Sequence, residues 1–241
     1  MAPKIRKNFQ FLLVRHGESI WNKQNRFTGW TDIPLTKNGE LQAENMGEIL
    51  LRNKIKPHCI FTSNLERAIK TSEIIKNKLN NNFEIYESWR LNEKSYGDCE
   101  GICRDDLIKL MSKDYVSELR RSFFMLPPNL ENDMKHNLYD YQLKTCKHYY
   151  EHNLQNGETK EMVLHRLLPH WYEAIIPKIK YHTCPLIVTH KHTARVLVKY
   201  LTQMPLKEFD NLDFPNSKIH HIKLNNEFFV DNLETDINIL E

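Results

Sequence analysis

The sequence predicts an α/β protein with a mainly parallel central sheet flanked by helices, together with a helical cap insertion. Short buried strands, amphipathic helices between them and an ordinary globular composition are the observations that predict it. The chain has 241 residues, of which 40% are hydrophobic and 27% charged, so it can bury a sizeable core. Its longest apolar runs span only a few residues, too few for a membrane-spanning helix.

The N-terminal part begins with a strand, a helix and a second strand. Asn8–Val14 ends in the apolar run Phe-Leu-Leu-Val, which indicates a buried strand. Thr36 can cap a helix with one apolar face, and Cys59–Phe61 indicates the next strand. The apolar face of that helix consists of Ala43, Met46, Gly47 and Leu50.

A second helix and a third strand follow directly. Ser63 or Asn64 can cap a helix with small and apolar residues at three-to-four spacing, and Phe83–Tyr86 indicates a strand. The spaced residues are Leu65, Ala68, Ile69, Ser72, Ile75 and Leu79. Strands that alternate with helices predict a parallel sheet covered by helices.

The middle of the chain, about residues 94–180, is expected to form the insertion over the sheet. Its helical stretches, Leu107–Leu119 and Val163–Ile176, flank a polar, Asn-rich region at Pro127–Asn156. We find no internal repeat and no low-complexity linker. The sequence therefore predicts a single domain, residues 1–241, that carries the insertion.

Two predicted strands end at a histidine. His16 follows the first strand, and Pro185–Thr189 indicates a later strand that ends at His190, before a helix over Ala194–Leu201. In open α/β sheets the ligand crevice lies beyond the carboxyl ends of the strands, so both imidazoles are expected in one pocket. Arg67 lies in the first turn of a helix, where free amide groups and the helix dipole favour an anion.

These residues lie in motifs that resemble the histidine phosphatase superfamily, and within it the cofactor-dependent phosphoglycerate mutases. The superfamily signature, a nucleophilic histidine within Arg-His-Gly, is present at residues 15–17. The similarity runs in order from about Phe11 to Pro215. Its motifs are Arg-His-Gly-Glu-Ser-Ile-Trp-Asn (15–22), Arg-Phe-Thr-Gly-Trp-Thr-Asp-Ile-Pro-Leu-Thr (26–36), Thr-Ser-Asn-Leu-Glu-Arg-Ala (62–68), Trp-Arg-Leu-Asn-Glu (89–93), and Arg120-Arg121 with Pro127-Pro128.

The resemblance implies a role for each matching residue. His16 is the expected nucleophile, which forms phosphohistidine, and a backbone carbonyl is expected to hold its other ring nitrogen protonated. Arg15, Arg67 and His190 are expected to neutralise the transferring phosphoryl group, and Glu93 to act as general acid and base. The expected substrate-binding residues are Asn22, Thr28, Gly29, Tyr96, Arg104, Arg120 and Arg121.

The implied activity is the interconversion of 3-phosphoglycerate and 2-phosphoglycerate, primed by 2,3-bisphosphoglycerate and independent of metal. The resemblance also implies a homodimer or homotetramer. Five cysteines without framework spacing, and no signal peptide, predict a cytoplasmic protein. The formal charge of +3 is spread along the chain, so neither nucleic acid nor a membrane is an expected partner.

Several positions depart from the mutase pattern and leave alternatives open. His190 is followed by Lys191 and His192 instead of Gly and Asn, and Lys94 and Ser95 replace the usual Arg and His. A less closed pocket admits water, which diverts phosphohistidine toward hydrolysis. The alternatives are a histidine-type phosphatase or bisphosphoglycerate-processing enzyme acting on a small phosphoester, and a degenerate member that binds a phospholigand or a partner without turnover.

One segment matches a zinc-protease motif. His148–His152 has the pattern His-x-x-Glu-His, but it lies in a polar segment without an obvious third ligand. Cys99 and Cys103, four residues apart, are too few for a zinc site. We therefore expect no metal centre.

Overall fold

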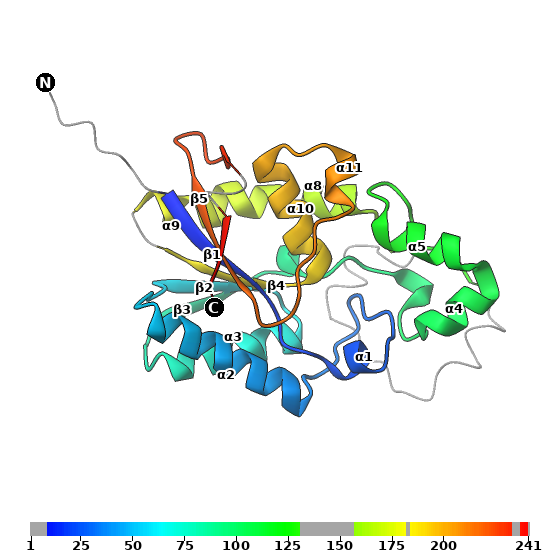
Figure 1. The fold of residues 1–241 in the computed structure, drawn as a ribbon, viewed down its shortest axis with the longest axis horizontal. Helices are drawn as coiled ribbons and strands as arrows, with labels where there is room; N and C mark the ends of the chain where they lie inside the picture. The colour runs from blue at the N-terminus through cyan, green and yellow to red at the C-terminus, as the bar shows by residue number, and fades with distance from the viewer. Residues whose placement is uncertain (1–8, 131–156, 182–183, 233–236, 241) are drawn as a thin grey trace, which may run out of the picture.

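The computed structural model describes residues 9–130, 157–181, 184–232 and 237–240. Its centre is a sheet of six described strands in the order β3-β2-β4-β1-β5-β6 (Figure 1). The strands are β1 (Phe9–Arg15), β2 (Cys59–Thr62), β3 (Glu84–Glu87), β4 (Leu186–Thr189), β5 (Ile219–Leu224) and β6 (Ile237–Leu240). The first four pair in parallel, and β5 and β6 add antiparallel pairs. The predicted mainly parallel sheet is confirmed.

Strand β1 is buried on both faces. Phe11 and Leu13 belong to one core cluster, whereas Leu12 and Val14 belong to another, because successive side chains of a strand point to opposite faces. All four are 0% exposed. This double burial explains why the sequence shows a continuous apolar run there instead of alternation.

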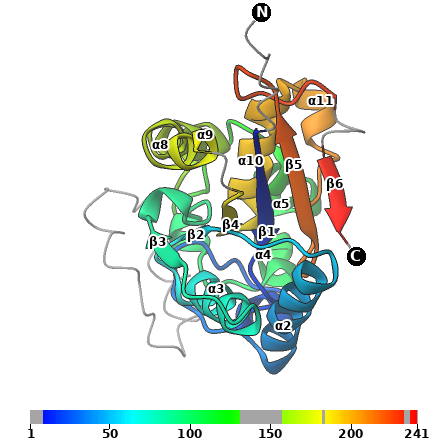
Figure 2. The same cartoon turned by 90° about the vertical axis from the view of Figure 1, so that its left-hand side faces the viewer.

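Helices cover both faces of the sheet. The helices α2 (Lys37–Arg52) and α3 (Glu66–Lys78) pack on one face, and α8 (Lys160–His170), α9 (Ile176–Lys180) and α10 (Lys191–Thr202) pack on the other (Figure 2). The shorter elements are α1 (Ile20–Lys23), α11 (Leu206–Phe209) and the 3-10 turns Trp89–Leu91 and Gly97–Cys99. No helix within the described ranges is long and apolar enough to span a bilayer.

One predicted helix cap is confirmed and another is wrong. The Thr36 hydroxyl accepts a hydrogen bond from Gly39 N at 3.0 Å and so caps α2. Helix α3, however, begins after Leu65, which supplies no side-chain cap, and not after Ser63 or Asn64. The Ser63 hydroxyl instead contacts a buried imidazole, so tertiary contacts override the local capping signal.

The helical stretch predicted over Leu107–Leu119 is helical in the structure except for a break at Ser112. The chain forms α4 (Arg104–Met111) and α5 (Lys113–Arg121), separated by Ser112 with φ of +133°. The Ser112 hydroxyl accepts from Tyr115 N at 3.2 Å and starts the second helix. Figure 1 shows this helix pair beside the sheet, where it encloses a small core of its own.

The helix predicted over Val163–Ile176 is longer and irregular. Helix α8 contains Pro169 and continues through a π-helical turn at Trp171–Ile175 into α9. Trp171 and Ile175 belong to the core on one sheet face, so this part of the range 94–180 lies against the sheet. The division of the chain into a domain and an insertion stays a prediction.

Candidate active site

The two strand-end histidines lie side by side. Arg15 and Thr189 are register partners in the parallel pair β1-β4, and each is followed directly by a histidine. The backbone continues this pairing, because His16 N donates to Thr189 O at 2.9 Å. The imidazole rings of His16 and His190 are consequently 4.9 Å apart between centroids.

His16 is oriented by its own loop. Its Nδ1 lies 2.6 Å from Gly17 O, and because a carbonyl only accepts, Nδ1 carries the hydrogen and Nε2 keeps a free lone pair. Burial lowers the pKa of His16 well below its usual value, and the Arg67 and Arg15 charges lower it further. A neutral imidazole with a free Nε2 can act as a nucleophile at neutral pH.

His190 is held by the loop after β2. Its Nε2 lies 2.7 Å from the Ser63 hydroxyl, and its Nδ1 has no hydrogen-bond partner among the described residues. Burial and the nearby Arg67 charge lower the pKa of His190 well below its usual value. A buried ring nitrogen without a partner gains a hydrogen bond when a ligand occupies the site.

Two arginines bring positive charge to the pocket. Arg67, 1% exposed, donates from Nη1 to Thr31 O at 3.0 Å and from Nη2 to Gly29 O at 2.7 Å. Burial lowers its pKa to about 10, so the guanidinium stays charged at neutral pH. Arg15 Nη2 lies 3.5 Å from Asn22 Oδ1. Two fixed cations beside a neutral imidazole suit a phosphoryl group.

Glu93 lies at the N-terminus of α10. Its Oε1 accepts hydrogen bonds from His192 N at 3.1 Å and from Lys94 N at 2.9 Å. The side chain is 9% exposed. Free amide groups and the helix dipole favour an anion at this position, and the buried cations Arg67 and Lys94 interact with the carboxyl group electrostatically.

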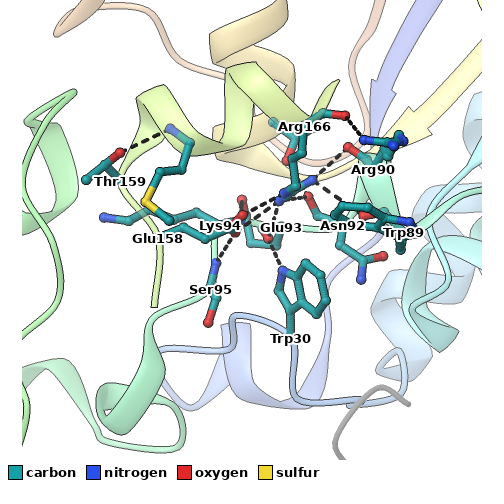
Figure 3. A network of polar contacts seen from close by, with 12 residues as sticks. Trp30, Trp89, Arg90, Asn92, Glu93, Lys94, Ser95, Glu158, Thr159 and Arg166 are labelled. Atoms are coloured by element: carbon teal, nitrogen blue, oxygen red, sulfur yellow. Dashed lines mark hydrogen bonds and ion pairs between the residues drawn. The ribbon is translucent and has the colours of Figure 1, made fainter. Parts of the chain in front are cut away.

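A buried ion pair holds the loop that carries Glu93 (Figure 3). Arg166 donates from Nε to Glu158 Oε1 at 2.7 Å, and from Nη2 to Glu93 O at 2.9 Å and Asn92 O at 2.9 Å. Trp30 Nε1 also donates to Glu93 O at 2.6 Å. The backbone of the proposed acid–base residue is thus fixed from two sides.

Most of the predicted site residues line one polar cavity of about 40 Å³. The predicted residues on its lining are Arg15, His16, Asn22, Thr28, Gly29, Arg67, Glu93, Tyr96, Arg104 and Arg120. We call this cavity the active pocket. His190 is not on this lining but lies beside His16, whereas Arg121 is exposed and lines a neighbouring cavity instead.

Several residues of the site were not predicted from the sequence. Arg26, Phe27, Lys191 and His192 also line the active pocket. His192 Nε2 lies 2.8 Å from the Tyr96 hydroxyl, and Lys191 Nζ pairs with Asp213 at 2.5 Å. The position after a strand end is the signal that could have identified Lys191 and His192, and the motif at 26–36 is the signal that could have identified Arg26 and Phe27.

The predicted absence of a metal centre stays a prediction. Across residues 9–130, 157–181, 184–232 and 237–240 no group of three or more His, Cys, Asp or Glu side chains could hold an ion. The His148–His152 motif lies outside these described residues.

Comparison with known proteins shows to which family the chain belongs. The profile of the histidine phosphatase superfamily, branch 1, matches residues 11–136 and 129–233. The chain belongs to the histidine phosphatase superfamily. The Arg-His-Gly resemblance is therefore confirmed at the level of the family.

Two curated relatives illustrate this membership. A 2,3-bisphosphoglycerate-dependent phosphoglycerate mutase of Buchnera aphidicola subsp. Cinara cedri is 39% identical over 88% of this chain and 92% of its own length. The protein of the same name from Blochmanniella floridana is 37% identical over 85% of this chain and 88% of its own length.

The solved structures share the fold of the superfamily. A mycobacterial glucosyl-3-phosphoglycerate phosphatase has a TM-score of 0.71 at 18% identity and covers 96% of this chain and 97% of its own. The α-ribazole phosphatase of Shigella flexneri has a TM-score of 0.65 at 21% identity and covers 96% of this chain and 95% of its own. These identities support a common fold only.

Proposed function

We propose that the chain is a 2,3-bisphosphoglycerate-dependent phosphoglycerate mutase, which interconverts 3-phosphoglycerate and 2-phosphoglycerate through phosphohistidine at His16. The observation that supports this most directly is the similarity to mutases so named, at 31–39% identity over most of the chain. The proposed cytoplasmic location and the homodimer or homotetramer stay predictions.

Attack begins at His16 Nε2. The lone pair of Nε2 forms a nitrogen–phosphorus bond while the bond from phosphorus to the ester oxygen breaks. The hydrogen bond of Nδ1 to Gly17 O keeps the ring in the reactive tautomer. Arg15 and Arg67 neutralise the charge on the equatorial oxygens during transfer.

Glu93 serves both directions of the reaction. Its carboxyl group donates a proton to the leaving alkoxide, and the resulting carboxylate later removes the proton of the acceptor hydroxyl. The network of Arg166 and Trp30 on its backbone keeps this group at a fixed distance from the reacting oxygen.

The pocket residues fit a bisphosphorylated acid. Arg104 and Arg120 line the active pocket together with Arg15 and Arg67. They supply positive charge for a second anionic group. His190 Nδ1 and Arg67 Nε, both buried, have no partner among the described residues and can donate to one. When bound, 2,3-bisphosphoglycerate supplies the phosphoryl group that primes His16.

Radiolabelled 2,3-bisphosphoglycerate tests the proposal. We expect acid-labile label on the wild-type chain, no label on His16→Ala, and normal labelling of His165→Ala, an exposed histidine on α8. The isomerisation of 3-phosphoglycerate is then compared with the release of phosphate. Phosphate release in excess of isomerisation would favour the phosphatase alternative, and binding without any label would favour the degenerate member.

A further inference from the structure

A second cavity, of about 360 Å³, adjoins the active pocket. It lies between α5 on one side and the chain around α10 and α11 on the other. Arg120, Lys191 and His192 line both cavities, so these side chains form a shared wall. Its volume falls within the range of about 300–1,000 Å³ that is usual for small-molecule sites.

Cationic side chains outnumber acidic ones on the lining of this second cavity. The cationic side chains are Lys113, Arg120, Arg121, Lys191 and Arg195. Two acidic residues, Asp210 and Asp213, also line it, and Asp213 is paired with Lys191. When this pair is set aside, four cationic side chains and one carboxylate are left on the lining. This excess of positive charge favours an anion.

Two buried side chains on this lining have donors without partners. Arg195 is 3% exposed and donates from Nη2 to Phe209 O at 2.6 Å, but its Nε has no partner among the described residues. The same holds for Nδ1 of His192, which is 6% exposed. When Tyr96 donates to His192 Nε2, Nδ1 carries the hydrogen.

An unpartnered buried donor is costly, and the two side chains that carry these donors line a cavity with an excess of positive charge. We propose that the second cavity is an anion-binding site, which takes a small polyanion with phosphate or diphosphate groups, independently of the group bound at His16. The site uses Lys113, Arg195 and the shared wall. The site shares Arg120 with the proposed substrate site, but Lys113 and Arg195 line the second cavity and not the active pocket, so the proposal does not rest on the mutase activity.

The test is isothermal titration of the full chain with pyrophosphate. We expect two equivalents to bind, one in each cavity. Arg15→Gln should weaken binding at one of the two sites, because Arg15 lines the active pocket and not the second cavity. Lys113→Glu should weaken binding at the other site at least about tenfold, because a carboxylate would then face the anion.

The variant at Lys113 is expected to fold. This residue is exposed and begins α5, where an acidic side chain suits the helix dipole. Lys207→Glu, an exposed lysine in the first turn of α11 that does not line the cavity, is the matched control and should bind as wild type. Arg195→Gln, checked for folding by circular dichroism, should reproduce the loss of Lys113→Glu.

Three results would overturn the proposal. One is that the chain binds a single equivalent of pyrophosphate, with an affinity that Arg15→Gln lowers and Lys113→Glu leaves unchanged. Another is a single equivalent that both variants weaken, since one anion would then span both cavities. The third is that a second equivalent of pyrophosphate binds with unchanged affinity to both the Lys113→Glu and the Arg195→Gln variants.

Discussion

Arg166 and Glu158 form an ion pair of 2.7 Å, and their side chains are only 7% and 1% exposed. The carboxylate is shared, because Glu158 Oε2 also accepts from Ser95 N at 2.8 Å. The pair joins the start of α8 to the loop between Asn92 and Ser95. The position of the proposed acid–base residue therefore depends on a contact that involves none of the arginines proposed to bind phosphate.

We expect Glu158→Gln to lower the free energy of unfolding by about 3–5 kcal/mol, because Arg166 would remain buried without its counter-charge. Urea denaturation measures this change. Lys109→Gln, which removes an exposed ion pair with Asp106 of 2.9 Å, is the control and should change stability by less than about 1 kcal/mol. Equal losses in the two variants would contradict the special cost of the buried pair.

Arg166→Lys should lower kcat about 10- to 100-fold while KM changes little, because a single ammonium cannot hold both Asn92 O and Glu93 O. The readout is steady-state kinetics, in which a loss confined to kcat indicates that Glu93 has been displaced. Arg90→Lys is the control, since the Arg90 side chain contacts the carbonyl of Arg166 and not Glu93. A rise in KM with an unchanged kcat would contradict the proposal that Arg166 positions Glu93.

Phosphorylation of His16 should be independent of pH from about pH 8 down to below 6.5. Burial and the neighbouring arginines depress the pKa of His16, so the neutral nucleophile persists until the pH falls through that lowered value. Arg67→Met removes one positive neighbour, which raises the pKa of His16 and therefore raises the pH below which the labelling rate declines. Rapid-quench labelling at each pH locates this decline. A decline at the same pH in Arg67→Met and in the wild type would contradict the electrostatic account.

Gly17→Ala should destabilise the loop that carries the nucleophile. A Cβ at this position would lie 2.2 Å from Gly39 O in the first turn of α2, so backbone must move. Overpacking of this kind costs typically about 1–3 kcal/mol, and the displacement falls on the neighbouring His16. We expect a lower urea midpoint and slower labelling, and a variant with wild-type values for both would show that the close approach is relaxed in solution.

The stability of the chain should rise with pH partly through Lys160. Its side chain is 0% exposed, and its pKa falls to about 6 through burial. Between that pKa and its unfolded value near 10.5 the unfolded chain binds one more proton, so unfolding becomes harder as the pH increases. Lys160→Met should therefore reduce the slope of stability against pH between about pH 7 and 8, by up to about 1 kcal/mol per unit.

The sheet and the histidines were predictable because their signals are local. Residues 11–14 form an apolar run buried on both faces, and His16 follows where polar residues begin. The split at Ser112 was not predictable, since the apolar spacing continues across it and only the positive φ marks the break. Propensity is a weak guide where tertiary packing decides where a helix starts or stops.

The parts of the site that escaped prediction act across long stretches of sequence. Arg166 reaches the carbonyl of Glu93 from 73 residues away, and its role shows only when α8 lies against that loop. Lys191 and His192 were noticed as departures from the mutase pattern, yet their place on a shared wall depends on how α5 packs. Arg121 is adjacent to Arg120 in sequence and shares the second cavity with it, but only Arg120 also lines the active pocket.

The central place of β1 in the sheet has a consequence for biosynthesis. The strand that ends at His16 is made first, but its sheet neighbours β4 and β5 are made only after β2 and β3, and Asn216 reaches the carbonyl of His16 from 200 residues away. A nascent chain on the ribosome thus holds His16 at the end of a strand that has no sheet neighbour until β4 emerges and only one until β5 emerges. Translation products that stop before β4 therefore carry His16 but lack the strands and the Asn216 contact that position it.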